Sequence, residues 1–224
     1  MAGQVRSRRR VVDHGEVFTA EREVNAMLDL VGAETERIES RFLEPACGNG
    51  NFIAEVLRRK LAVVAARYRR SPDEYQRYAF LAVSSIYGVD ILADNVGECR
   101  ERLFRIVEKD ARPNIKDSIE PAFLDAVRYV LEKNILCGDA LTLRDASGEP
   151  ITFAEWSMLR GDLVKRRDFL LSELLEGNVE KDEQPSLFGE ALMRWDFDEE
   201  TQAYLPAPVR EYPPVDYREV GRNG

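Results

Sequence analysis

The sequence predicts an α/β fold built on a parallel sheet, and three observations support this. Short apolar runs alternate along the chain with stretches in which apolar residues recur at helical spacing. A glycine-bearing turn, 46–51, follows the first of these runs. The next two runs each end on an acid, Asp90 and Asp139. Alternating strands and helices are typical of a parallel sheet, in which ligands bind beside the carboxyl ends of the strands.

The expected elements follow from this alternation. The predicted strands are 41–44, 85–90, 134–139 and 151–156. The predicted helices are 20–31, 51–69, 73–83, 93–108, 119–133 and 165–175. Thr19 is placed to cap the first helix and Gly32 to end it. These elements predict one domain over 13–175.

The two ends of the chain differ from this domain in composition. Residues 1–12 are basic and lack an apolar period, so we expect a loose arm. Residues 176–224 form an acidic, proline-containing tail, for which we expect an extended, irregular appendage. The formal net charge is −9, and seven of these nine units lie in the tail. The acidity therefore does not exclude a nucleic-acid partner, although the domain shows no evident basic face.

Composition excludes several classes of protein. No apolar run approaches the ~18 residues of a membrane span, and no apolar segment follows the basic N-terminus as in a secretory signal. Cys47, Cys99 and Cys137 are an odd, widely spaced set, which predicts a reducing cytoplasm and no disulfide framework or zinc site. With His14 as the single histidine, a Ser/His/Asp triad and a histidine-rich metal site are not expected.

The turn after the first strand has the chemistry of an anion- or cofactor-binding loop. It reads Glu44-Pro-Ala-Cys-Gly-Asn-Gly-Asn-Phe52 and opens the second helix. Glycines remove the Cβ atoms that block close approach, and a helix N-terminus presents free N–H groups. Glu44, just before the turn, can meet a positively charged group. The alternative is a tight strand-to-helix turn without a ligand.

Two acids extend this candidate site across the sheet. An acid at the position of Asp90, at the end of the second strand, typically pairs with the ribose hydroxyls of a nucleoside cofactor. Gly138-Asp139 ends the third strand. Taken singly, Asp90 could be an ordinary exposed acid and Gly138-Asp139 a simple turn. Together with the glycine turn they predict a site for an adenosine-type cofactor.

These motifs resemble the adenine-specific (amino-group) DNA methyltransferases of restriction-modification systems. Phe42-Leu-Glu-Pro-Ala-Cys-Gly-Asn-Gly-Asn-Phe52 is similar to that family's S-adenosylmethionine motif, and Tyr87-Gly-Val-Asp90-Ile91 and Ile135-Leu-Cys-Gly-Asp139-Ala-Leu141 to its next two motifs. The resemblance covers roughly 12–143 and implies a Rossmann-like methyltransferase fold. The cofactor-binding residues it implies are Phe18, Thr19, Glu44, Ala46, Gly48, Gly50, Asp90, Ile91, Asp139 and Ala140.

The sequence departs from this family in two places. Ala20 follows Phe18-Thr19 where the family has proline. The family's catalytic Asn/Asp/Ser-Pro-Pro-aromatic motif, which binds a flipped base, is not found after Asp139, so the catalytic residues stay unassigned. Tyr212-Pro213-Pro214-Val215 has the wrong flanking residues and is interpreted as tail or as a docking segment. A dinucleotide oxidoreductase is disfavoured because no third glycine follows Gly50 in register.

The predicted sheet is too small for a whole methyltransferase. Unless 151–170 covers it, the strand at 41–45 would be a sheet edge, which is unusual for a buried parallel strand. We therefore expect an incomplete fold: the cofactor-binding part of a DNA adenine methyltransferase. One explanation is that a partner chain, in a hetero- or homo-oligomer, supplies the missing half of the sheet and the contact with DNA; the other is that the chain is a truncated or degenerate gene product. The alternative is a non-catalytic cofactor-binding subunit of a restriction or phage-defence system. Methylation of another substrate is a weaker third hypothesis.

Overall fold

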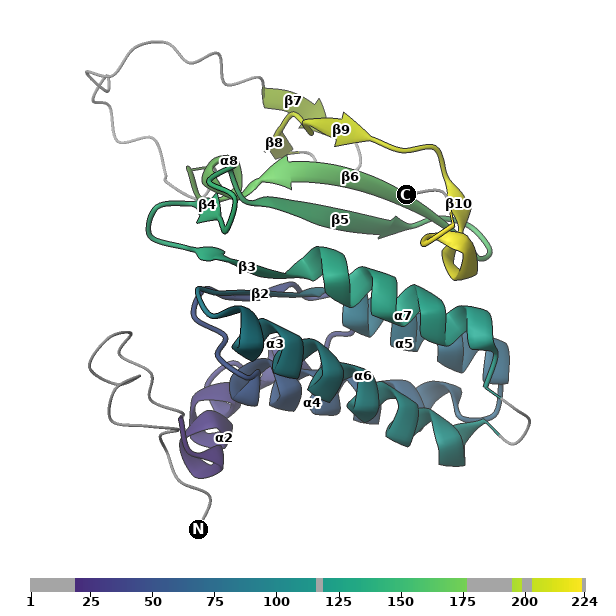
Figure 1. Cartoon of the computed structure of the whole chain (residues 1–224). Helices are drawn as coiled ribbons and strands as arrows, with labels where there is room; N and C mark the ends of the chain where they lie inside the picture. The colour runs from purple at the N-terminus through teal and green to yellow at the C-terminus, as the bar shows by residue number, and fades with distance from the viewer. Residues whose placement is uncertain (1–18, 116–118, 177–194, 199–202, 223–224) are drawn as a thin grey trace.

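The computed structural model describes residues 19–115, 119–176, 195–198 and 203–222. Its main sheet has the strand order β1-β2-β3-β4 (Figure 1). β1 (Phe42–Glu44), β2 (Ile86–Asp90) and β3 (Ile135–Asp139) pair in parallel, and the short β4 (Arg144–Asp145) pairs antiparallel with β3. The predicted α/β class and the parallel pairing of its first three strands are therefore confirmed.

Helices cover one face of this sheet (Figure 1). They are α2 (Glu21–Asp29), α3 (Gly32–Thr35), α4 (Asn51–Tyr68), α5 (Pro72–Ser84), α6 (Ala93–Asn114) and α7 (Pro121–Asn134). α4 packs on β1 and β2, and α6 on β2 and β3. The first helix differs from its prediction at both ends, because Ala20 rather than Thr19 is its N-cap and it ends at Asp29, before Gly32. No helix in the described part of the chain could cross a membrane, since none is both long and apolar enough.

A β-hairpin covers the other face of the sheet. β5 (Thr152–Met158) and β6 (Leu163–Leu170) are antiparallel, and Tyr87 of β2 packs edge-on against Phe153, with ring centroids 5.2 Å apart. The Tyr87 hydroxyl donates to the Ala154 carbonyl at 3.2 Å. The helix predicted over 165–175 is therefore wrong over most of its length. Only α8 (Leu171–Glu176) is helical, because residues 163–170 pair along β5 instead.

The described part of the C-terminal tail returns to the domain. β9 (Arg210–Glu211) and β10 (Val215–Asp216) pair with β6, and a 3-10 turn over Tyr217–Glu219 follows. Tyr217 is fully buried in the main core. The expected extended appendage is thus wrong for 207–222. β7 (Trp195–Asp198) and β8 (Ala203–Pro206) form a separate hairpin. The predicted arm at 1–12 and residues 177–194 lie outside the described residues.

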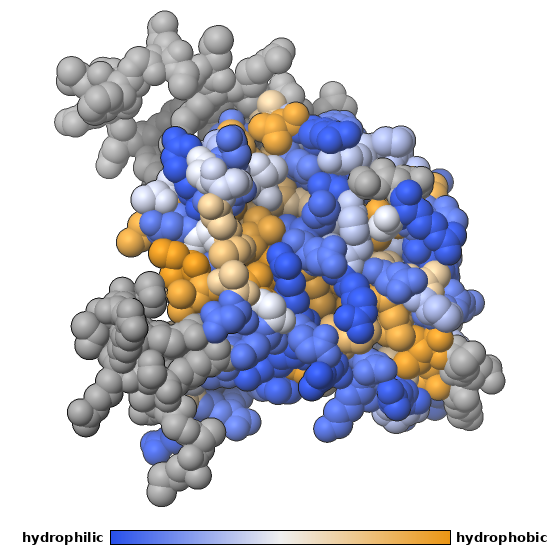
Figure 2. All heavy atoms as spheres, viewed as in Figure 1, coloured by the Kyte–Doolittle hydropathy of each residue, from blue (hydrophilic) through white to orange (hydrophobic). Residues whose placement is uncertain are grey.

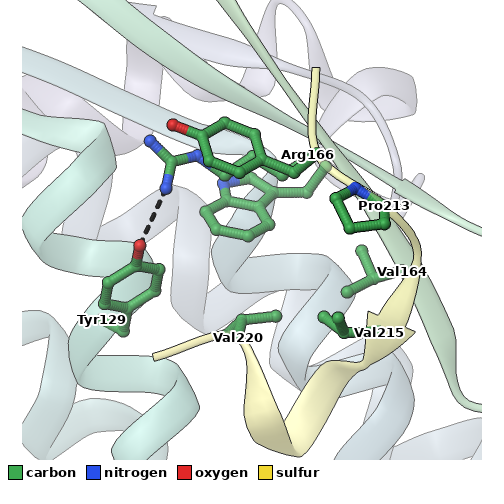
Figure 3. A pocket seen from close by; sticks show the side chains of 8 residues that line it. Tyr129, Val164, Arg166, Pro213, Val215 and Val220 are labelled. Atoms are coloured by element: carbon green, nitrogen blue, oxygen red, sulfur yellow. Dashed lines mark hydrogen bonds between the residues drawn. The ribbon is translucent and has the colours of Figure 1, made fainter. Parts of the chain in front are cut away.

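A largely buried arginine, Arg166, fixes this returning segment (Figure 3). The Arg166 guanidinium binds Asp168 through two 2.8 Å contacts and donates to the Tyr129 hydroxyl at 2.8 Å. It also stacks on the ring of Tyr212, 4.3 Å from its centroid. Pro213 lines a cavity of about 50 Å³ beside this group. The Pro213-Pro214 segment thus docks on its own chain.

β1 lies at the edge of the sheet. Among the described residues it pairs with β2 alone, and the β5–β6 hairpin lies over the face of the sheet instead of extending it. The side chains of Arg41 and Glu155 join the start of β1 to β5 at 2.5 Å. The expected edge position of the first strand is therefore confirmed.

Candidate functional site

Three acids lie on one face of the sheet at the carboxyl ends of adjacent strands. Glu44 of β1 is opposite Gly88 of β2, and Asp90 is opposite Cys137 of β3. Side chains alternate between faces along a strand, so residues two apart share a face. Glu44, Asp90 and Asp139 therefore point to the same face, on strands spaced about 4.8 Å apart.

The glycine turn lies in front of these strand ends and requires glycine at two positions. Gly48 and Gly50 have φ values of 52° and 87°, in the left-handed region that disfavours side chains. A Cβ on Gly50 would also lie 2.7 Å from the Cys99 sulfur of α6. The Gly50 N–H donates to the Cys47 carbonyl at 2.8 Å, and the Cys47 N–H donates to Val89 at 2.8 Å. The turn is thus held against β2 before α4 begins.

Asp90 is buried and joins the second strand to this turn. Its Oδ2 accepts the Gly48 N–H at 2.8 Å, and its Oδ1 accepts the Leu92 N–H at 2.9 Å and the Asn95 amide at 3.2 Å. A carboxylate has about four acceptor positions, so about one remains. Asp90 can therefore take one ligand hydroxyl without releasing the turn.

The other two acids retain more acceptor capacity. Asp139 is half-buried, and its Oδ1 accepts the Leu141 N–H at 2.9 Å. Among the described residues, no group donates to its Oδ2. Burial raises the pKa of Glu44, although the Ala46 N–H, 3.4 Å from its Oε1, opposes this shift. A half-buried carboxylate of this kind favours a positively charged partner.

Apolar surface accompanies the acids. Ile91 directly follows β2 and is 56% exposed, and Leu141 follows β3 and is 95% exposed. Ala140, which lies between Asp139 and Leu141 in the sequence, is half-buried and packs against the core under β5. Figure 2 shows a hydrophobic patch at the end of the molecule where β2 and β3 finish. Exposed apolar surface beside carboxylates suits the ring and edge of a nucleobase.

Three residues connect the turn to the helices on either side. The Asn51 side chain donates to the Thr19 carbonyl at 3.3 Å and accepts a hydrogen bond from Arg102 of α6. Thr19 is therefore brought to the turn, whereas Phe18 lies outside the described residues. Asn51 and Arg102 were missed by sequence reasoning, since nothing local indicates that α6 reaches the turn. Asn49 Oδ1 is buried there without a hydrogen-bond partner in the described chain.

Most of the expected residues thus gather at the carboxyl ends of the strands: Thr19, Glu44, Ala46, Gly48, Gly50, Asp90, Ile91, Asp139 and Ala140. Trp156, considered for base stacking, is instead buried, and its indole N–H donates to Asn134 at 3.1 Å. Among known proteins, no family model, curated protein or solved structure matches the chain.

Proposed function

We propose that this chain is the S-adenosylmethionine-binding part of an adenine-specific DNA methyltransferase and needs a partner for catalysis. The observation that carries the proposal is the common face of Glu44, Asp90 and Asp139 behind a glycine turn. The resemblance of the surrounding motifs to that family supplies the cofactor class. Bound there, the cofactor would supply a methyl group on a positively charged sulfur.

The residues present fit this cofactor. Asp90 has an acceptor position for a ribose hydroxyl, and Asp139 Oδ2 has one for the adenine amine. Ile91 offers an apolar surface for the ring, and Glu44 can hold the amino group of the methionine part. The orphaned Asn49 Oδ1 at the turn is a further acceptor near the ligand. Each of these residues binds or orients; none is assigned to the transfer step.

A non-catalytic role is the second candidate. The described strand ends carry acids and apolar residues but no polar-Pro-Pro-aromatic motif, and the Pro213-Pro214 pair lies against Arg166 instead. A cofactor-binding subunit of a restriction or phage-defence system fits that absence equally well. In either case we place the protein in the cytoplasm, where its free thiols would stay reduced.

The open edge of β1 is where we expect the partner. The Phe42 N–H donates to the Ser85 carbonyl at 3.0 Å, so Phe42 points its backbone groups at β2. Backbone groups alternate along a strand, which directs the N–H and C=O of Leu43 away from β2. A partner strand that pairs with Leu43 would extend the sheet beyond β1, as in β-strand addition.

Proline at position 43 tests the partner edge. The Leu43 N–H bonds nothing in β2, so Leu43→Pro should keep the fold and S-adenosylmethionine binding. It should abolish association with a polypeptide bearing Asn-Pro-Pro-Tyr, such as one encoded beside this chain, whereas Leu43→Val should associate normally. Equal association of both variants would exclude this edge.

Methyl transfer separates the two candidate functions. The purified chain with S-adenosylmethionine carrying a tritiated methyl group should not label adenine in duplex DNA, but should do so once the Asn-Pro-Pro-Tyr partner is added. Labelling by the chain alone would contradict the need for a partner. Cofactor binding without labelling in the reconstituted pair would favour the non-catalytic role.

A further inference from the structure

A hollow of about 610 Å³ lies on the outer surface of α4 and α6. Its lining residues are Arg58, Gly97, Glu98, Glu101, Arg102, Arg105, Ile106 and Lys109. Four of them are cations and two are carboxylates. This concentration of positive charge is unexpected in a chain whose net charge is −9.

The cations converge because of their positions in the helices. Arg102, Arg105 and Lys109 follow one another at spacings of three and four residues on α6, so they share one face of that helix. Arg58 reaches the hollow from α4. Gly97 adds open backbone to the lining, since a Cβ there would meet nothing within 4 Å. A ligand can therefore approach α6 closely at the Gly97 end of the hollow.

Two of these cations pair with no carboxylate among the residues that the structure describes. Arg105 binds Glu101 at 2.7 Å and Arg58 binds Glu55 at 3.2 Å. Neither Arg102 nor Lys109 forms an ion pair with any described acid, and Arg102 donates instead to an amide oxygen, that of Asn51. Burial and the nearby Arg58 lower the pKa of Arg102. A desolvated guanidinium beside a second one is stabilised by an anion.

We propose that this hollow binds neighbouring phosphate groups of a nucleic-acid backbone. Arginine forks match the oxygens of a phosphate, and a mobile lysine can hold a neighbouring phosphate as a point charge. Phosphate contacts position a protein on nucleic acid without reading its sequence. The hollow gives the chain its own contact with the backbone that needs no partner, while its Arg102 also binds Asn51 beside the glycine turn.

The test is binding of a 20-base-pair DNA duplex, followed by fluorescence anisotropy over a range of salt concentrations. Arg105→Gln/Lys109→Gln removes two cations that do not contact the glycine turn. It should weaken binding about 10-fold and lower the slope of log K against log salt by about 2, roughly one unit per lost phosphate contact. The matched control is Arg37→Gln/Arg222→Gln, which removes the same charge from exposed, ion-paired residues outside α4 and α6.

Inorganic phosphate distinguishes the source of the ligand. If phosphate competes with the duplex and both are weakened by the double variant, the shared phosphate chemistry is supported. If only DNA binds, the backbone itself is the ligand. Phosphate binding without DNA binding would overturn the nucleic-acid assignment. Equal DNA affinity and salt slope in both double variants, each with an unchanged thermal midpoint, would overturn the site. None of these outcomes bears on the proposed S-adenosylmethionine site, which is tested by a separate binding measurement.

Discussion

The carboxylate of Asp90, at the end of β2, accepts the backbone N–H of Gly48 at 2.8 Å and so fixes the glycine turn that follows β1. The same carboxylate accepts the Leu92 N–H and the Asn95 amide. Sequence reasoning assigned Asp90 a ligand-binding role alone. In the structure it also connects two strands and the start of α6, so its removal affects the fold as well as the site.

Asp90→Asn should lower the free energy of unfolding by about 1–3 kcal/mol, because an amide nitrogen would replace one acceptor and leave a buried donor unpaired. Urea denaturation measures this change. Asp125→Asn, at an exposed position of α7, is the control and should alter stability by less than about 0.5 kcal/mol. Equal stability of the two variants would show that Asp90 does not hold the turn.

Two glycines should respond to alanine in opposite directions. Gly50→Ala places a methyl group 2.7 Å from the Cys99 sulfur at a φ of 87°, so it should destabilise the protein by at least about 1 kcal/mol. Gly97→Ala adds a methyl group in open space within α6 and should stabilise it by about 0.5–1 kcal/mol. Urea midpoints compare them, and the same sign for both would contradict the turn geometry.

Stability should rise with pH through the buried Lys60. Its ammonium donates to the Ile38 carbonyl at 2.9 Å, to the Ser40 carbonyl and to the Ser85 hydroxyl at 2.7 Å. Burial lowers the pKa of Lys60 to about 7, against a smaller opposing effect of Glu39 and Glu34. Between pH 7 and the ordinary value of 10.5 the unfolded chain then holds a proton that the folded chain lacks.

The free energy of unfolding should therefore increase from pH 7 towards pH 10. Below pH 7 the contribution of Lys60 to this free energy should be smaller and should no longer change with pH. Lys60→Met removes the titrating group. The free energy of unfolding of the wild type minus that of this variant should therefore increase with pH across that window. Denaturation at several pH values measures it. A difference that is constant from pH 6 to 10 would show that the pKa of Lys60 is not lowered.

Arg166 should hold the C-terminal segment. Its side chain and that of Asp168 are 13% and 11% exposed, so Arg166→Ala leaves a buried carboxylate without its cation. We expect a loss of about 3 kcal/mol and faster tryptic cleavage at Arg210. Lys165→Ala removes a more exposed ion pair with Glu211 and should change stability by at most about 1 kcal/mol. Similar effects of the two variants would contradict this role.

The sequence predicted those parts of the fold that depend on local pattern. β1, β2 and β3 are short apolar runs between helices with clear periods, and the glycine turn is specified by its own residues. β6 was missed because its strand conformation depends on contacts with distant segments. It pairs with β5, and its Arg167 and Lys165 form ion pairs with Glu155 and Glu211, respectively. The conformation of such elements depends on packing between distant segments, which the local spacing of apolar residues does not predict.

The candidate site shows the same division. Asp90 and Asp139 were found because each ends a strand. The contact of Arg102 with Asn51, 51 residues away, was not predicted, nor was the burial of Lys60 under β1. The return of Tyr217 to the core was also missed, since five prolines after Gly177 favour an extended segment by composition alone.

Isothermal titration of the purified chain with S-adenosylmethionine tests the central claim most directly. The wild type should release or absorb heat that saturates. Asp139→Asn, which replaces the free Oδ2 acceptor without touching the glycine turn, should weaken binding at least ~10-fold, or about 1.4 kcal/mol. Asp125→Asn should bind as the wild type does. No saturable heat at millimolar S-adenosylmethionine, from a chain that unfolds cooperatively in urea, would contradict the account.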